Sequence, residues 1–261
     1  MTWVVGGAST LGYAVGMSDI CVSFRDGSRR DCLQKIYPLA RFIAVGFAGS
    51  VQIGFSMLDH IRIWLKDAPE NTAWIPEETA EIFPEVARTV WSGSEPNEQA
   101  LCSHLMLLAA HPTLDTLPGM SRCFAYIFRS PAFVREEIQR GKVESIRSGR
   151  FVESYKQSLE EFSANPLSML RGEEMGYKQG TRALEWIVGL RVRKNPTDGV
   201  SPHFHTCRVE RGNIQVWPND EKIYYPNGDT LDFVMPAVAH SYPEFLAMVA
   251  SGGRSAECAV C

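Results

Sequence analysis

The hydrophobic and polar positions of the first 66 residues divide into strand-like and helix-like segments. Residues 2–6, 12–19 and 42–47 are rich in β-branched, aromatic and small apolar side chains and are bounded by glycine or polar turns, which predicts three strands. Ser50 then precedes a segment with helical periodicity, so we expect a helix over 51–65 with Ser50 as its cap. Its apolar face consists of Ile53, Met57, Ile61 and Leu65.

The remaining chain predicts further helices and strands in alternating groups. Expected helices span 78–90, 97–110, 151–162, 173–190 and 243–250, and expected strands span 123–128, 142–148, 204–211 and 214–217. Gly212-Asn213 is typical of a tight hairpin turn between the last two strands, and 224–229 indicates a second hairpin. Segregated groups of strands and helices favour an α+β fold with antiparallel sheets. We expect no break that requires a second independent domain.

Composition and charge exclude some classes of function. The chain has 261 residues, 45% of them hydrophobic, and its 26 basic and 30 acidic side chains give a net charge of −4. This balance provides no basic field, so we expect neither nucleic acid nor a membrane surface as a partner. Without an apolar run of membrane-spanning length or a signal-peptide pattern, the expected location is the cytoplasm.

The cysteine pattern does not predict a disulfide framework or a metal centre. Seven cysteines are scattered along the chain, and only Cys258 and Cys261 have Cys-x-x-Cys spacing. That pair has no second pair or histidines nearby, so we expect an unstructured tail there. His203 and His205 alternate as on one strand face without an evident third ligand, which favours a structural pair over a metal site. We therefore expect no cofactor.

Thr2 raises the question of chemistry at the start of the chain. A small residue after the initiator methionine permits removal of Met1, which would leave Thr2 with a free α-amine. A threonine in this state carries both a hydroxyl nucleophile and a base on one residue. Residue type alone favours the simpler interpretation, in which Thr2 only begins an edge strand.

A succession of landmarks changes that interpretation. Thr2 is followed by a strand ending in Ser18-Asp19, then by Lys35-Ile36, and then by Ala-Val-Gly-Phe-Ala-Gly-Ser over 44–50 before the first helix. This order resembles the proteasome β-subunit family of N-terminal nucleophile (Ntn) hydrolases, in particular the bacterial proteasome-related peptidase subunits. The family pattern has Ala-Gly-Phe-Ala-Gly, so Val45 is an insertion here.

Two later landmarks are similar to the family but depart from it. Ser148-Gly149 occupies the place of a Gly-Ser-Gly turn, with Arg147 instead of the first glycine. Asp198-Gly-Val-Ser201 matches the first four positions of Asp-x-x-Ser/Thr-Gly, and Pro202 replaces the last glycine. The resemblance is clearest over 2–66 and weaker over 124–217. Residues 67–123 and those after about 218 have no assigned counterpart.

The resemblance implies a fold and a set of site residues. The implied fold is a four-layer αββα sandwich of two antiparallel sheets flanked by helices, formed by residues 1–220 with an insertion around 67–123. Residues 221–261 would be a C-terminal extension with a flexible tail. The implied catalytic residues are the nucleophile Thr2, the charged pair Asp19 and Lys35, the oxyanion donor Gly49, the orienting residues Ser148 and Asp198, and Ser201 as a support of Asp198.

Each of these residues also has an ordinary structural interpretation. Asp19 and Lys35 could form a solvated pair at strand ends, and Gly49 could only permit close packing of strand and helix. Ser148 could be a helix cap, and Asp198-Gly199 is common in turns.

The resemblance also implies partners. Family members stack as rings around an enclosed chamber, so we expect a homo-oligomer, a peptide or protein substrate and an ATP-driven unfoldase as a possible partner. The alternatives are a catalytically inactive scaffold with the same fold, or an Ntn amidase that acts on a small molecule.

Removal of Met1 provides the first prediction. Intact-mass spectrometry of the purified protein should show the loss of one methionine, because only that loss exposes the α-amine of Thr2. Retention of Met1 would leave the amine in a peptide bond and would count against catalysis by Thr2.

Overall fold

A computed structural model of the chain describes residues 2–9, 12–67, 75–148, 200–218, 221–224, 230–251 and 259–260. Within these residues the fold is mixed α+β, and every strand pair in its sheets is antiparallel. The predicted α+β class is therefore confirmed.

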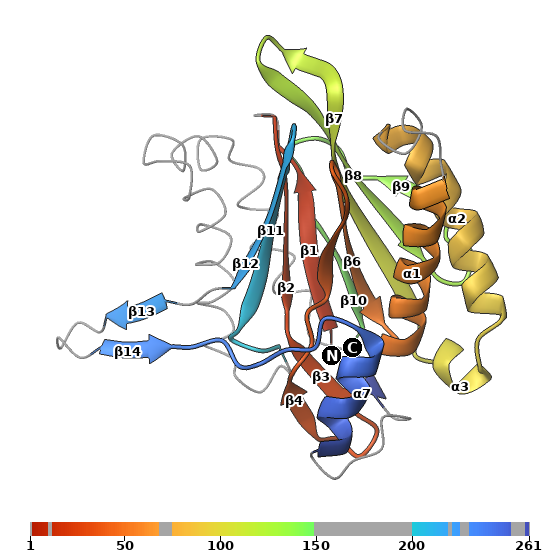
Figure 1. The fold of residues 1–261 in the computed structure, drawn as a ribbon, viewed down its shortest axis with the longest axis vertical. Coiled ribbons are helices and arrows are strands. Elements are labelled where there is room, and N and C mark those ends of the chain that lie inside the picture. Colours follow the sequence, from red (N-terminus) through yellow and green to blue (C-terminus); the bar gives the residue numbers. More distant parts are fainter. Residues whose placement is uncertain are drawn as a thin grey trace.

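Two five-stranded sheets form the centre of the molecule (Figure 1). The first sheet has the order β10-β1-β2-β11-β12, and the second has the order β5-β6-β7-β8-β9. The strands of the first sheet are β1 (Thr2–Ala8), β2 (Ala14–Asp19), β10 (Glu144–Ser148), β11 (Phe204–Glu210) and β12 (Asn213–Pro218). Those of the second sheet are β5 (Ile36–Ala40), β6 (Ile43–Gly49), β7 (Ser103–Leu117), β8 (Met120–Arg129) and β9 (Arg135–Glu137).

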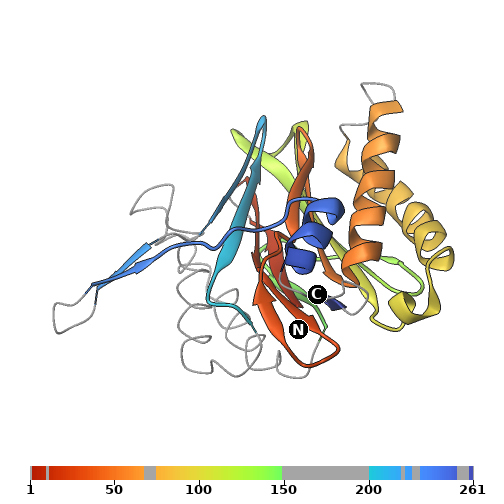
Figure 2. The same ribbon diagram turned by 60° about the horizontal axis from the view of Figure 1, so that its bottom comes forward.

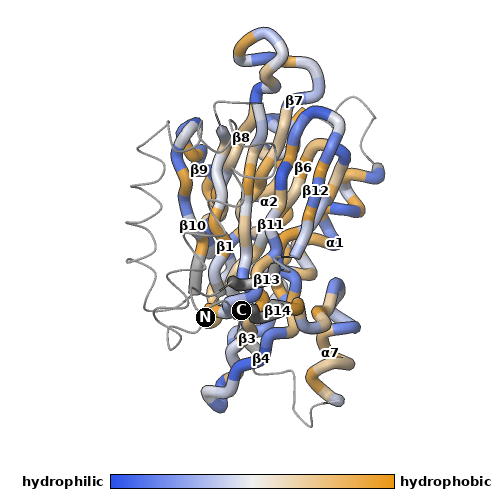
Figure 3. The backbone as a smooth tube through the Cα atoms, turned by 90° about the vertical axis from the view of Figure 1, so that its left-hand side faces the viewer, coloured by the Kyte–Doolittle hydropathy of each residue, from blue (hydrophilic) through white to orange (hydrophobic). Residues whose placement is uncertain are grey.

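Side chains of different size separate the two faces of β6. Ile43, Val45 and Phe47 belong to the core shared with the helices, whereas Ala44 and Ala48 belong to the core between the two sheets. Because successive strand residues point to opposite faces, this alternation lets the sheets approach closely on one side and gives the helices a bulky surface on the other. Figure 3 shows the hydrophobic positions that run along the strands of both sheets.

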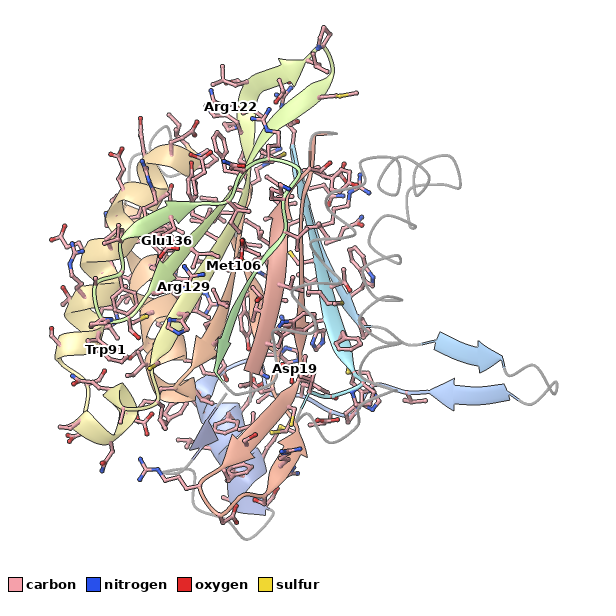
Figure 4. The ribbon with its side chains drawn as sticks, turned by 180° about the vertical axis from the view of Figure 1, so that it is seen from behind. Asp19, Trp91, Met106, Arg122, Arg129 and Glu136 are labelled. Carbon is pink, nitrogen blue, oxygen red and sulfur yellow. The ribbon has the colours of Figure 1, made fainter. Side chains whose placement is uncertain are left out.

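Glycines allow the sheets to meet at their centre. Gly6 and Gly16 are direct partners in the β1–β2 ladder. A Cβ atom on Gly16 would lie 2.4 Å from a methyl carbon of Leu108, and one on Gly6 would lie 2.9 Å from the sulfur of Met106. Both distances are too short for van der Waals contact, so a larger residue at either position would displace these β7 side chains. Met106 is labelled in Figure 4 near the middle of the molecule.

Helices cover the outer face of the second sheet (Figures 1 and 2). They are α1 (Val51–Asp67) and α2 (Pro76–Ser92), and the short α3 (Pro96–Gln99) follows them. Ser50 caps α1 as predicted, since its Oγ accepts a hydrogen bond of 3.1 Å from the N–H of Ile53. Phe55 and Phe83 are among the buried side chains through which the two helices join the core.

The remaining described elements lie beside these layers. β3 (Cys21–Phe24), β4 (Arg29–Asp31) and β15 (Ala259–Val260) form a three-stranded sheet, so two residues of the expected unstructured tail are in a strand. β13 (Glu221–Tyr224) pairs with β14 (Thr230–Phe233), which confirms the predicted second hairpin. The predicted C-terminal helix is α7 (Tyr242–Ser251).

One predicted helix is wrong. The segment 97–110 contains only α3 before β7 begins, and Cys102 between them has a positive φ of 58°, which ends the helical turn. Residues 105–110 are buried throughout, because the first sheet covers one face of β7 and the helices cover the other. A strand buried on both faces has a continuous apolar run, which periodicity does not distinguish from a buried helix.

Other expectations differ only in detail or fall outside the described residues. The turn between β11 and β12 consists of Arg211 and Gly212, since Glu210 pairs with Asn213. The expected helices 151–162 and 173–190 lie outside the described residues. None of the described helices is long and apolar enough to cross a membrane.

The close approach of the sheets predicts the cost of a single methyl group. Gly16→Ala should lower the free energy of unfolding by about 1–3 kcal/mol, because the added Cβ forces Leu108 and the strand apart. Gly93→Ala is the matched control, since its Cβ would be 3.5 Å from the nearest atom at the end of α2. Urea denaturation of both variants measures the difference, and an equal loss in both would contradict this account of the interface.

Candidate active site

Asp19 lies at the end of β2, next to the start of β1 (Figure 4). Its side chain is fully buried. Val4 pairs with Ser18 in the β1–β2 ladder, which brings the carboxylate of Asp19 to the level of Trp3. The backbone N–H of Trp3 donates a hydrogen bond of 3.1 Å to Asp19 Oδ1. The register of two strands therefore places a carboxylate beside the first residues of the chain.

Lys35 reaches the same oxygen from the segment that leads into β5. Its Nζ lies 2.8 Å from Asp19 Oδ1 and 2.6 Å from the carbonyl oxygen of Cys21, and its side chain is fully buried. A buried ion requires a counter-charge and hydrogen-bond partners, because burial removes its hydration. Asp19 supplies the charge and the β3 backbone supplies a further acceptor.

The second carboxylate oxygen of Asp19 is held by backbone donors. Asp19 Oδ2 accepts a hydrogen bond of 3.2 Å from the N–H of Cys21 and a longer one of 3.5 Å from the N–H of Ser201. Together with Trp3, these contacts fix the carboxylate from three segments of the chain. The ammonium of Lys35 is therefore held close to the backbone that directly follows Thr2.

Thr2 itself is the first described residue of β1. It pairs with Ser148 of β10 in the antiparallel ladder, so these two predicted site residues are neighbours across two strands. Arg147, which replaces a glycine of the family pattern, pairs with Trp3. Asp198 lies outside the described residues.

Gly49 ends β6 directly before the first turn of α1 and has a φ of +112°. A Cβ atom at this position would lie 2.2 Å from the carbonyl oxygen of Cys102, so conformation and space both require glycine. The N–H of Ser50 donates to that carbonyl on the β7 side, and the N–H of Phe47 donates to the carbonyl of Lys35 on the β5 side. Backbone N–H groups alternate in direction along a strand, so the N–H of Gly49 points to the same side as that of Phe47. This is the β5 side, on which the carbonyl of Lys35 lies.

Ser201 makes contacts that the sequence did not indicate. The resemblance implied that Ser201 supports Asp198, but its Oγ donates its single proton to Asp31 Oδ2 at 2.6 Å. The same Oγ accepts a hydrogen bond of 2.9 Å from the N–H of His203. Asp31, at the end of β4, therefore holds Ser201, whose backbone N–H donates to Asp19. Its position in the polar stretch 25–31 gave no signal of this role.

Cys21 lies beside the charged pair but is not suited to act as a nucleophile. Burial, with a further contribution from the negative charge of Asp19, raises the pKa of its thiol to about 12. The nearby Lys35 opposes this shift without reversing it. The thiol is therefore protonated at neutral pH, and thiolate chemistry is disfavoured. The five described cysteines are free of disulfides.

Metal chemistry has no support among the residues that the structure describes. They include no group of three or more histidine, cysteine or acidic side chains placed to hold a metal ion.

Comparison with known proteins adds no assignment. No protein-family model matches the chain, and no curated protein matches it.

The buried pair predicts a strongly asymmetric response to mutation. Lys35→Met should lower the free energy of unfolding by about 3–5 kcal/mol, because it leaves the carboxylate of Asp19 buried without its cation. Adding Asp19→Asn should restore part of that loss, since the amide carries no charge that needs a partner. Chemical denaturation of the two single variants and the double variant gives the coupling energy.

An exposed ion pair provides the control. Arg129 pairs with Glu136 across β8 and β9 with side chains 38% and 51% exposed, and both are labelled in Figure 4. Arg129→Met should cost about 1 kcal/mol or less. A similar loss at Lys35 and Arg129 would refute the special role of burial.

Proposed function

We propose that this protein is a threonine-type Ntn amide hydrolase, acting as a peptidase after removal of Met1. The observation that carries the proposal is the buried ion pair of Asp19 and Lys35, because one oxygen of Asp19 binds both the ammonium of Lys35 and the N–H of Trp3. The pair is fully buried and held by the backbone adjacent to Thr2, unlike a solvated pair at strand ends. Charged side chains are rarely fully buried, which supports a functional role for this pair.

The nucleophile in this proposal is the hydroxyl of Thr2. A threonine hydroxyl needs a base to remove its proton, and the freed α-amine of the same residue can accept that proton through a water molecule. The positive charge of Lys35 favours the unprotonated amine and the developing alkoxide. Attack on an amide carbonyl then gives an acyl ester on Thr2 and releases the amine product with the transferred proton. Water then hydrolyses the ester, which releases the acyl group as a carboxylic acid and restores the hydroxyl of Thr2.

Gly49 is the proposed donor to the oxyanion that forms during the attack. Its N–H faces the side of β6 on which the Lys35 carbonyl lies, and there it is proposed to donate a hydrogen bond to the substrate oxygen. Ser148 of β10, opposite Thr2, is proposed to orient the α-amine. Asp198 is proposed to assist Ser148, and the N–H of Ser201 to orient Asp19.

The described layers are compatible with the complete Ntn sandwich. Two antiparallel sheets pack face to face, with helices on one outer side. By the resemblance we propose that the whole chain has the four-layer αββα order. By the same resemblance we propose a ring-shaped homo-oligomer in the cytoplasm with peptide or protein substrates and an ATP-driven unfoldase as partner.

The decisive test is substitution of the proposed nucleophile. Thr2→Ala should abolish hydrolysis of fluorogenic peptide amides while the thermal unfolding midpoint stays within a few degrees of the wild type. Thr2→Ser should retain activity, since it preserves both the hydroxyl and the α-amine. A peptide vinyl sulfone should add its mass to the N-terminal peptide of the wild type and not to that of Thr2→Ala.

The alternatives give distinct results in the same assays. Activity unchanged in Thr2→Ala would refute the proposal. Hydrolysis of small amides without hydrolysis of peptides would indicate the amidase. Absence of both, together with a stable oligomer, would indicate the inactive scaffold.

A further inference from the structure

The segment that carries Lys35 is held by residues from the other end of the chain. Residues 239–251, here called the C-terminal clamp, comprise Ala239, His240, Ser241 and α7. Ala239 pairs with Leu33 in a bridge next to the site (Figure 1 shows α7 beside β3). The family resemblance implies no function for the C-terminal extension, so it does not account for this contact.

Backbone hydrogen bonds connect the two segments in both directions. The N–H of Gln34 donates to the carbonyl of Ala239 at 3.1 Å, and the N–H of Ala239 donates to the carbonyl of Cys32 at 2.8 Å. These bonds enclose Leu33, two residues before Lys35. The carbonyl of Lys35 accepts from Phe47 on its other side at 3.0 Å. Lys35 is therefore fixed between β6 and the C-terminal clamp.

The side chain of Gln34 strengthens the connection. Its Nε2 donates to the carbonyl of Ile36 at 2.7 Å, which leaves Oε1 as the acceptor for His240 Nδ1 at 2.8 Å. The imidazole must therefore carry its proton on Nδ1.

The anchoring of α7 explains why the C-terminal clamp is a firm support. Glu244 Oε2 accepts the N–H of His240 at 2.8 Å, and Ser241 Oγ accepts the N–H of Glu244 at 3.4 Å, which resembles a capping box at the start of the helix. Phe245 and Val249 are buried in the core shared with α1. Arg30 of β4 donates to the carbonyl of Met248 at 2.6 Å.

We propose that Gln34 and His240 are positioning residues for Lys35, and that the C-terminal clamp holds the ammonium at the distance from Thr2 that catalysis needs. The inference rests on the proposed function and deepens it. A small displacement of a charged group in an active site has a large effect on rate, because its stabilisation of the transition state depends on distance and orientation.

The test compares three variants of the full-length protein. His240→Ala removes the donor to Gln34 and should lower kcat about fivefold with KM within twofold of the wild type. His240→Asn should restore most of kcat, since its amide N–H can donate to the same oxygen. His60→Ala is the control, because His60 is exposed on α1 and its Nδ1 contacts only the carbonyl of Ser56 in its own helix among the described contacts.

A second measurement does not depend on activity. Cys32 is fully buried beneath the Ala239 contact, and burial raises the pKa of its thiol to about 11. Alkylation by iodoacetamide, located by peptide mass spectrometry, should be about fivefold faster at Cys32 in His240→Ala than in wild type or His240→Asn. Cys207 is buried in β11 and should react at the same rate in all variants.

The outcomes separate the two proposals. Lower kcat with faster labelling of Cys32, both reversed in His240→Asn, supports the inference. Faster labelling with unchanged kcat overturns the positioning role, and unchanged labelling overturns the clamp. Equal acceleration at Cys207 would indicate general destabilisation and would also overturn it. The wild-type protein could also show no hydrolysis while the protection of Cys32 still depends on His240. That result would refute the proposed function and support the C-terminal clamp.

Discussion

The buried ion pair between Asp19 and Lys35 is the interaction on which the rest of the site depends. Both side chains are inaccessible to water, so each charge is tolerable only while the other remains in contact. The contact in turn requires that β2 ends beside β1, that β3 presents the Cys21 carbonyl, and that the Lys35 segment is held in place. One electrostatic requirement therefore constrains four segments that are distant in sequence.

Packing between the sheets provides the rigidity that this interaction needs. Gly6 and Gly16 allow close contact with Met106 and Leu108. The large side chains of β6 point toward the helices, and its small ones point toward the first sheet. A closely packed interior deforms little, so the ends of its strands are held in a single arrangement. Asp19 of the charged pair lies at the end of β2, so the packing of the apolar core determines the geometry of the pair.

Much of the local structure follows from the sequence, and the errors have physical causes. β1, β2 and β6 are buried on both faces, but β-branched, aromatic and small apolar residues between glycine or polar boundaries made them predictable as strands. The helices α1 and α2 were predictable from their helical periodicity and clear boundaries. β7 was not, because it is covered on both sides and loses the period-two pattern of a half-exposed strand. Tertiary burial, which no local pattern records, determined its conformation.

The candidate site was predictable to the extent that side chains define it. Asp19, Lys35 and Gly49 could be selected by residue type and order, and the structure brings the first two into contact. The N–H of Trp3 and the carbonyl of Cys21 could not be predicted as parts of the site, because almost every residue has such backbone groups and only the fold determines which of them lie there. The contact between Gln34 and His240 spans 206 positions, and no sequence pattern connects them.

The bridge between Leu33 and Ala239 also has a consequence for biosynthesis. Chains emerge from the ribosome amino end first, and the early strands can begin to associate while translation continues. The support for Lys35, however, comes from residues about 206 positions further along the chain. The mature geometry around Lys35 can thus be reached only after residues 239 and 240 have been translated, so a product that terminates before them would lack it.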